Sequence, residues 1–428
     1  MYRMARIRGN TQLKAARQHA GYASQQALAD ALTDAAPRIG LGRMDVSARQ
    51  VRRWESSSPP WPRTDHQRLL VHVLQQPIEQ LGFIPPWETT AHPGATAGPP
   101  QRDRPRSAVT RAALPLPVAT TGVQPPTLAA DFATVTVAHR RLYWSVRPTQ
   151  LHPAVVEHTR LGTHLLAETS GVTRRLLAAA LAESLLLAGR IEFFDIRRPA
   201  EADETLVHSL QAAAEADDPL LGSAILAHAA FIPGWDGRRD EAAERIRAAR
   251  TYARRAPASA EFLAWLDAVE AECETRCDRP REGLRLISHA EGLLKDGTPH
   301  SSPEWFDWFS PTRLAAFKGN TQLNAGHLAQ AHETLVAVLN ALPDNAGKQR
   351  TVILGDLAAV EAARKNPEAA CAYAVEAMDQ LAITWYATGM DRIVDVRRAL
   401  QPWADSDEVR DLDDRIYGWQ TTLRALRR

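Results

Sequence analysis

The sequence predicts an all-α protein built from two helical regions and a linker. Apolar residues recur at the 3.6-residue spacing that places them on one face of a helix, in segment after segment of the 428-residue chain. Short breaks of Gly, Pro and Asp separate these segments, and no stretch alternates apolar and polar residues as a half-buried strand does. We therefore predict a helical domain at 1–84, a linker at 85–127 and a helical repeat domain at 128–428.

Five short helices are predicted in the N-terminal domain. The first covers Thr11–Ala20. The second begins after Ser24 and the third after Ser47, because a serine hydroxyl at this position accepts a hydrogen bond from a free backbone N–H of the first turn. The fourth and fifth cover Thr64–Leu74 and Pro77–Leu81, and Pro77 stands at a position that tolerates proline.

The linker is defined by its composition. Residues 85–127 hold 10 of the 28 prolines, and Ala, Thr and Gly fill most of the remaining positions. Such a segment buries too little apolar surface to offset the entropy lost on ordering. We expect a flexible, partly extended and disordered tether.

Five similar segments of the C-terminal domain predict repeated helix hairpins. In each, a small residue stands where two helices cross closely, since a larger side chain would hold the helices apart. These residues are Ala202, Ala242, Gly283, Ala331 and Ala369. Their spacings of 40, 41, 48 and 38 residues favour a solenoid of helix pairs over the alternative, an irregular helical bundle.

Charge is distributed unevenly along the chain. Residues 1–84 hold 12 Arg and Lys against 6 Asp and Glu, whereas residues 128–428 hold 35 against 42. A basic domain on an acidic body indicates a polyanion as the partner of the basic domain. Three cysteines exclude a disulfide framework, and the chain shows no signal peptide and no apolar run of membrane-spanning length. We expect a cytoplasmic protein without membrane contact.

The third predicted helix, within SARQVRRWES, carries the pattern that points to function. At 100° per residue, Val51 and Trp54 share one face, and Arg49 and Arg53 lie on the opposite face. A helix fits the major groove of DNA, and an outward Arg bonds guanine bidentately, which contributes about 1–3 kcal/mol of discrimination. The alternative is a solvated basic surface.

Three segments, LKAARQHAGYASQQALADAL, VSARQVRRWESS and LVHVLQQPIEQLGF, resemble the Xre-type helix-turn-helix domain of phage repressors. The resemblance implies base-facing positions at Ala48, Arg49 and Arg53, and it implies backbone contacts near Gln25 and other polar residues. The complete predicted set of DNA-contacting residues is Ser24, Gln25, Ser47, Ala48, Arg49, Gln50, Arg52, Arg53 and Ser56. The loop between the second and third helices, DAAPRIGLGRMD, is longer than in that family.

The order of the regions extends the resemblance. A basic Xre-type head, a proline-rich tether and a TPR-like body are similar to a class of actinobacterial transcription regulators. The stretch PEWFDWFSPTRLAAFKGNTQLNAGHLAQA looks like the aromatic-rich helix and following repeat of that class. The resemblance implies regulation of nearby genes, often in secondary metabolism or development, and implies no particular effector.

The body is the predicted sensor, since a solenoid of helix pairs presents a concave surface. Four large rings lie within Trp305–Phe309, and in a helix they would span more than one turn and could not all face one core. We therefore predict that Trp305, Trp308 and Phe309 bind a ligand, with the filling of a junction between repeats as the alternative.

The sequence thus predicts a dimeric transcription regulator that binds double-stranded DNA and senses a small molecule, peptide or protein. The chain holds no GxxxxGK[ST], GxGxxG or HExxH motif, and we expect no enzyme activity, no cofactor and no metal. The alternative is a TPR-type interaction adaptor whose head does not bind DNA specifically.

Overall fold

The fold was analysed in a computed structural model that describes residues 9–42, 44–57, 59–83, 124–125 and 127–426. These residues form eighteen α-helices and no strand, which confirms the all-α prediction. None of the described helices combines the length and the apolar character needed to cross a membrane. The chain divides into two compact units, 1–102 with 397–428, and 103–396. The predicted linker lies almost entirely outside the described residues.

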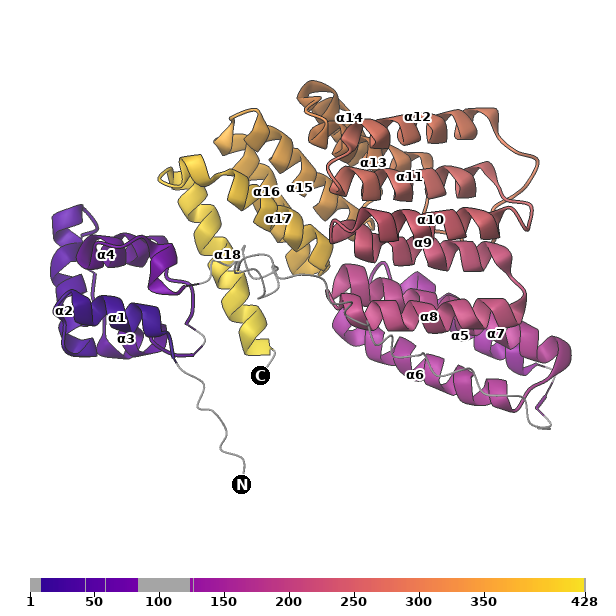
Figure 1. The fold of residues 1–428 in the computed structure, drawn as a ribbon, viewed down its shortest axis with the longest axis horizontal. Coiled ribbons are helices and arrows are strands. Elements are labelled where there is room, and N and C mark those ends of the chain that lie inside the picture. Colours follow the sequence, from indigo (N-terminus) through magenta and orange to yellow (C-terminus); the bar gives the residue numbers. More distant parts are fainter. Residues whose placement is uncertain (1–8, 43, 58, 84–123, 126, 427–428) are drawn as a thin grey trace, which may run out of the picture. The chain divides into compact units, whose positions relative to one another are not determined.

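The first unit begins with the predicted short helices (Figure 1). They are α1 (Thr11–His19), α2 (Gln25–Ala35), α3 (Ala48–Trp54) and α4 (Thr64–Leu74), with 3₁₀ turns at Ala36–Ile39 and Ile78–Leu81. All five predicted helices are present, and the fifth is the second 3₁₀ turn. Both predicted caps are confirmed: Ser24 Oγ accepts from the Ala27 N–H at 3.0 Å, and Ser47 Oγ accepts from the Gln50 N–H at 3.3 Å.

The core of this unit is mainly apolar, and the buried Asn10 side chain links three of its segments. The largest fully buried side chains include Leu13, Leu28, Leu32, Leu69, Leu70 and Leu81. The side chain of Asn10 donates to the carbonyl of Trp54 at 3.2 Å and to that of Leu81 at 2.9 Å. It thereby joins the start of α1 to the end of α3 and to the last turn. The unit also includes α18 (Asp407–Leu426).

The second unit is a succession of helix pairs (Figure 1). It opens with α5 (Leu128–Leu142) and α6 (Pro148–Ala167). The pairs are α7 (Gly171–Arg190) with α8 (Pro199–Ala216), α9 (Pro219–Trp235) with α10 (Arg239–Ala253), α11 (Ala260–Arg276) with α12 (Pro280–Asp296), α13 (Pro311–Asn324) with α14 (Leu328–Ala341), and α15 (Gly347–Ala363) with α16 (Pro367–Ile383). Each pair packs against the next, and α17 (Ala387–Ala399) follows the last pair.

Small residues stand at the helix crossings. Ala202, Ala242 and Ala331 are at most 2% exposed. A Cβ atom at Gly283 would lie 2.6 Å from the Thr275 hydroxyl, so no larger residue fits there. In the last pair the prediction was one residue early: Ala370, the fourth residue of α16, is fully buried, while its neighbour Ala369 is half-buried. Two consecutive alanines made the register ambiguous in the sequence.

The aromatic segment Trp305–Phe309 corrects a prediction. It lies in a non-helical connection between α12 and α13, whereas an aromatic-rich helix was expected. Because the backbone here is irregular, Trp305, Phe306 and Trp308 all turn into one core, each 7–8% exposed. The spacing argument against a shared core was therefore wrong. This connection also accounts for the longest repeat spacing.

Hydrogen bonds and one ion pair join the turn after α7 to helices near the end of the second unit. A π-helical turn, Ile191–Asp195, extends α7. The Thr388 hydroxyl donates to the carbonyl of Phe194 at 2.9 Å, and the Trp385 indole N–H donates to the carbonyl of Asp195 at 3.1 Å. Lys348, on α15, forms a buried ion pair with the Asp195 carboxylate. The turn after α7 is therefore bound to α15, to α17 and to the segment that joins α16 to α17.

The crossing constraint makes a testable prediction. The substitution Ala202→Leu should lower the free energy of unfolding by about 1–3 kcal/mol, because it overpacks a fully buried crossing. The matched control is Ala200→Leu, at an exposed position of the same helix, which should change stability by less than about 0.5 kcal/mol. Urea denaturation of both variants measures the difference. Equal effects would show that the crossing tolerates a large side chain.

Candidate functional site

The first candidate site is the outer face of α3. Its inner face is fixed by Val51 and Trp54, which are 0% and 2% exposed, as the sequence predicted. Arg49, Arg52 and Arg53 are exposed. Within the described residues, Arg49 and Arg53 form no ion pair with a carboxylate. The helix thus presents guanidinium groups outward from an apolar anchor.

A buried ion pair fixes the end of α3 to the two preceding helices. Glu55 accepts a hydrogen bond from Arg17 Nε at 2.7 Å and one from Gln25 Nε2 at 2.7 Å. The side chains of Arg17 and Glu55 are only 5% and 6% exposed. Arg17 also donates to the carbonyl of Tyr22 at 2.8 Å. One carboxylate therefore sets the position of α3 relative to α1 and α2.

The long loop before α3 is tied back to α2. The backbone N–H of Val46 donates to the Thr33 hydroxyl at 3.0 Å, and Val46 is buried. Gly40 and Gly42 have φ of +80° and +64°, the left-handed conformation that favours glycine. The loop thus turns sharply and returns to α2 before α3 begins, despite its length.

The remaining predicted DNA-contacting residues take differing roles. Ser24 and Ser47 are helix caps, and the Ser56 hydroxyl donates to the carbonyl of Arg53 at 2.8 Å. Gln25 accepts from Arg52 Nε at 3.3 Å as well as donating to Glu55. Ala48 is half-buried at the start of α3.

Gln50 is held within its own unit rather than directed freely outward. Its amide nitrogen lies 3.2 Å from His66 Nε2, and the His66 ring packs edge-on against Trp54. Burial and the nearby Arg63 lower the pKa of His66, which favours the neutral ring. Sequence analysis did not foresee this contact.

The buried carboxylate of Glu55 gives a second prediction. Glu55→Ala should destabilise the first unit by about 3–5 kcal/mol, because it leaves the Arg17 charge buried without its partner. Hydrogen exchange of the α1–α3 amides in the full chain measures the loss. Asp30→Ala removes an exposed carboxylate of α2 and should leave the protection unchanged. If Arg17→Ala and Glu55→Ala were additive in the double variant, the pair would not be coupled.

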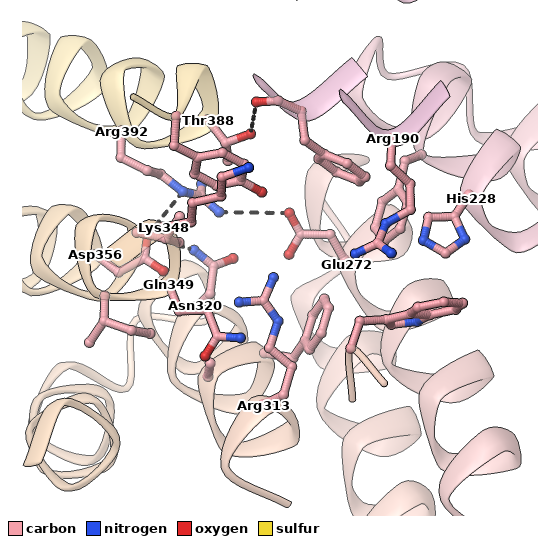
Figure 2. Close-up of a pocket in the computed structure, with 18 of the residues that line it drawn as sticks. Arg190, His228, Glu272, Arg313, Asn320, Lys348, Gln349, Asp356, Thr388 and Arg392 are labelled. Atoms are coloured by element: carbon pink, nitrogen blue, oxygen red, sulfur yellow. Dashed lines mark hydrogen bonds and ion pairs between the residues drawn. The ribbon is translucent and has the colours of Figure 1, made fainter. Parts of the chain in front are cut away.

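The second candidate site is a cavity inside the second unit. Its volume is about 100 Å³, measured as the space open to the centre of a water molecule. Its walls come from the first helix of every pair, together with the π-helical turn, α17, the end of α5 and the connections that hold Trp308 and Tyr386. The lining residues that matter most to its chemistry are Tyr143, Arg190, Phe194, His228, Phe231, Trp235, Trp265, Glu272, Trp308, Arg313, Asn320, Lys348, Asp356 and Arg392 (Figure 2).

Of the three predicted ligand-binding residues, the cavity includes one. Trp308 is in its wall. Trp305 stacks on Trp308 with ring centroids 5.8 Å apart, and Phe309 packs at the edge of the same core, so neither lines the cavity. Two further aromatic residues, Trp235 and Tyr386, stand out in the sequence as weaker candidates of the same kind, and both line the cavity. Sequence analysis did not predict the charged lining residues, although Arg190 is a charge that follows the long apolar run of α7.

Arg190 is a buried cation between aromatic rings. It is 8% exposed, and its guanidinium carbon lies 4.6 Å from the Trp308 ring centroid and 5.0 Å from that of Tyr143. Such cation–π contacts stabilise the charge through the faces of the rings. No carboxylate among the described residues lies within 4.0 Å of its nitrogens. The π-helical turn that follows it is a feature often found at functional sites.

The other charges of the cavity are largely balanced. Lys348 pairs with Asp195, which also accepts from the Tyr143 hydroxyl at 3.0 Å. Arg392 Nε lies 3.1 Å from the Asp356 carboxylate. Asp356 also accepts from the Asn320 amide at 3.1 Å.

Glu272 belongs to the same balanced network. Its carboxylate lies 3.1 Å from Arg276 Nε and 3.7 Å from Arg392 Nη2. Burial opposes the charge on Glu272, but these two guanidinium groups outweigh it and hold the pKa of Glu272 below its ordinary value. Glu272 is therefore ionised, and its charge is matched by Arg276.

Comparison with known proteins adds no family to this description. No protein-family model matches the chain, and a search of the curated proteins finds no match. Function is therefore inferred from the two sites themselves.

His228 is the neutral polar group of the aromatic wall. Its Nδ1–H donates to the carbonyl of Ala224 at 2.8 Å, and its ring lies 5.1 Å from Trp265 and 5.3 Å from Trp308. Burial, with the nearby Arg190 charge, lowers the pKa of His228 to about 3. Its Nε2 is therefore an unprotonated acceptor at neutral pH.

This gives a third prediction, on pH. The His228 ring should stay neutral in the folded protein down to pH values well below its ordinary pKa of 6.5. Because the unfolded chain takes up the proton first, the contribution of His228 to stability is fully present above pH 6.5 and is lost as the pH falls toward about 3. NMR titration of the histidine rings checks this, with His228→Gln to assign the signal. Protonation near the ordinary value would contradict it.

Proposed function

We propose that the chain is a cytoplasmic, sequence-specific DNA-binding transcription regulator. The outer face of α3 would read the operator, and the second unit would dimerise and sense an effector. The observation that carries the proposal is the pair of exposed cations, Arg49 and Arg53, on a helix whose opposite face is locked into the unit. A rigidly held helix with outward Arg is suited to bidentate contacts with guanine in the major groove.

The contacts of the neighbouring polar residues refine the roles within this proposal. Gln25 and Gln50 are already bonded to Glu55 and His66, so we assign them to contacts with the phosphate backbone or to positioning. Arg52 is partly engaged by Gln25. We therefore assign the contacts with the DNA bases to Arg49 and Arg53. Ala48 would lie close to the bases and contribute an apolar contact. In this reading the first unit is an Xre-type helix-turn-helix domain.

The second unit fits the role of a TPR-like solenoid in the same proposal. Its helix pairs succeed one another with small residues at the crossings, as stacked hairpin repeats require. A single head of this size buries too little DNA surface for tight specific binding, which favours a dimer on two half-sites. The cavity supports a sensor role for the body.

The fourth prediction tests DNA reading. The full-length protein is first used to select its operator from fragments of its own genome. Arg49→Ala with Arg53→Ala should then abolish most discrimination between operator and random DNA, at about 1–3 kcal/mol for each guanine contact. The control, Lys14→Ala with Arg38→Ala, removes two exposed positive charges elsewhere in the unit and should keep that discrimination. Affinities are compared at one salt concentration.

The salt dependence separates this proposal from an adaptor. If phosphates are neutralised, log K should fall with log salt with a slope of about 0.9 for each phosphate contacted. Failure to enrich any DNA, or an affinity that does not change with salt, would favour a TPR-type interaction adaptor. Unchanged discrimination in the Arg49→Ala, Arg53→Ala variant would reject the assigned contacts.

A further inference from the structure

The cavity of the second unit carries a surplus of positive charge. Its lining includes the cations Arg190, Arg313, Lys348 and Arg392 and the anions Glu272 and Asp356. The ion-pair partners outside the lining, Asp195 and Arg276, contribute one charge of each sign. Two positive charges therefore remain, and they belong to Arg190 and Arg313, which have no ion pair among the described residues. Figure 2 shows both guanidinium groups directed into the space beside Glu272.

The surplus is placed where an anion would be held tightly. A buried charge without a partner is costly, and Arg190 is more than nine-tenths buried. Because the rings of Tyr143 and Trp308 lie against Arg190, hydrogen bonding is left to the N–H groups at the edge of its guanidinium plane. A carboxylate accepts two such parallel N–H groups from one guanidinium.

Two indole side chains of the cavity wall carry N–H groups that the surrounding fold leaves unsatisfied. The indole N–H groups of Trp235 and Trp308 are buried and have no hydrogen-bond partner in the described structure. Both residues line the cavity.

The shape of the apolar wall indicates the body of the ligand. Phe194 lies 5.3 Å from Phe231 and 5.6 Å from Trp235, with the rings edge to face, so the wall offers several ring edges and faces together. The cavity volume of about 100 Å³ is of the order of a cavity known to hold one benzene molecule, about 150 Å³.

We propose that this cavity binds a small aromatic carboxylate, with the ring against Phe194, Phe231 and Trp235 and the carboxylate on Arg190 and Arg313. This inference rests on the proposed function and deepens it, because it names the chemical class of the effector. Figure 2 shows the two guanidinium groups and the surrounding side chains that would enclose the ligand.

The test is calorimetric titration of the purified full chain with three probes. Benzoate supplies ring and charge, benzamide has the same shape without the charge, and inorganic phosphate has charge without the ring. We expect benzoate to bind at least about tenfold more tightly than either of the others, as a charge-assisted contact combined with ring packing requires. Equal affinity for benzamide, or no benzoate binding at millimolar concentration, would overturn the proposal.

Variants locate the binding within the protein. Arg190→Gln and Arg313→Gln should each weaken benzoate binding by at least about tenfold, since each removes a charge-assisted hydrogen bond. Arg160→Gln is the matched control, because the Arg160 side chain is 65% exposed on the same unit, and it should bind as the unchanged protein does. Arg313 is only half-buried, so its variant stays informative if Arg190→Gln unfolds. Unchanged benzoate affinity in a folded Arg313→Gln variant would reject the site.

Two further measurements separate this proposal from the DNA-binding one. The Arg49→Ala, Arg53→Ala variant should bind benzoate normally, and Arg313→Gln should bind the operator normally without ligand. Operator binding without benzoate binding would reject the ligand class and leave the regulator standing. Benzoate binding without operator binding would leave the ligand site standing in a protein of another function.

Discussion

Close approach of neighbouring helices is the constraint on which the second unit depends. Residues without a large side chain, such as Ala202 and Gly283, let each second helix lie directly on its partner. The first helices are consequently surrounded on most sides, and they carry many of the polar and aromatic groups that line the cavity. If a crossing were widened by one large side chain, the walls would move by more than the tolerance of a hydrogen bond. The packing of the second helices at the crossings therefore determines the positions of the side chains that line the cavity.

In the first unit, the relative positions of the helices depend on one buried carboxylate. The Glu55 carboxylate joins three helices at once, and the outward direction of Arg49 and Arg53 follows from where that carboxylate holds α3. A buried ion pair adds little net stability compared with an apolar contact of the same shape, but it accepts only one arrangement of its partners. Thr33 provides a second fixed point by holding Val46 after a long loop.

Periodicity in the sequence predicted what depends on neighbours along the chain. The helices of the first unit, their serine caps and the burial of Val51 and Trp54 all follow from local pattern, and the structure has them. The Trp305–Phe309 segment was misread because helical spacing was assumed where the backbone is irregular. The cavity was not predicted, because its residues come from helices far apart in sequence and because buried Glu272 or Asp356 look like surface residues until the helices around them are placed.

The contacts that join the end of α7 to α15 and α17 change how the second unit must unfold. In an open array of repeats each pair touches only its neighbours, so the ends can fray one pair at a time. Here Asp195 is bonded to Lys348 and Trp385, which lie more than a hundred residues further along the chain. Neither the α7–α8 pair nor the α15–α16 pair can leave without breaking these contacts. Opening the array between α7 and α17 therefore costs these long-range contacts in addition to those between neighbouring pairs.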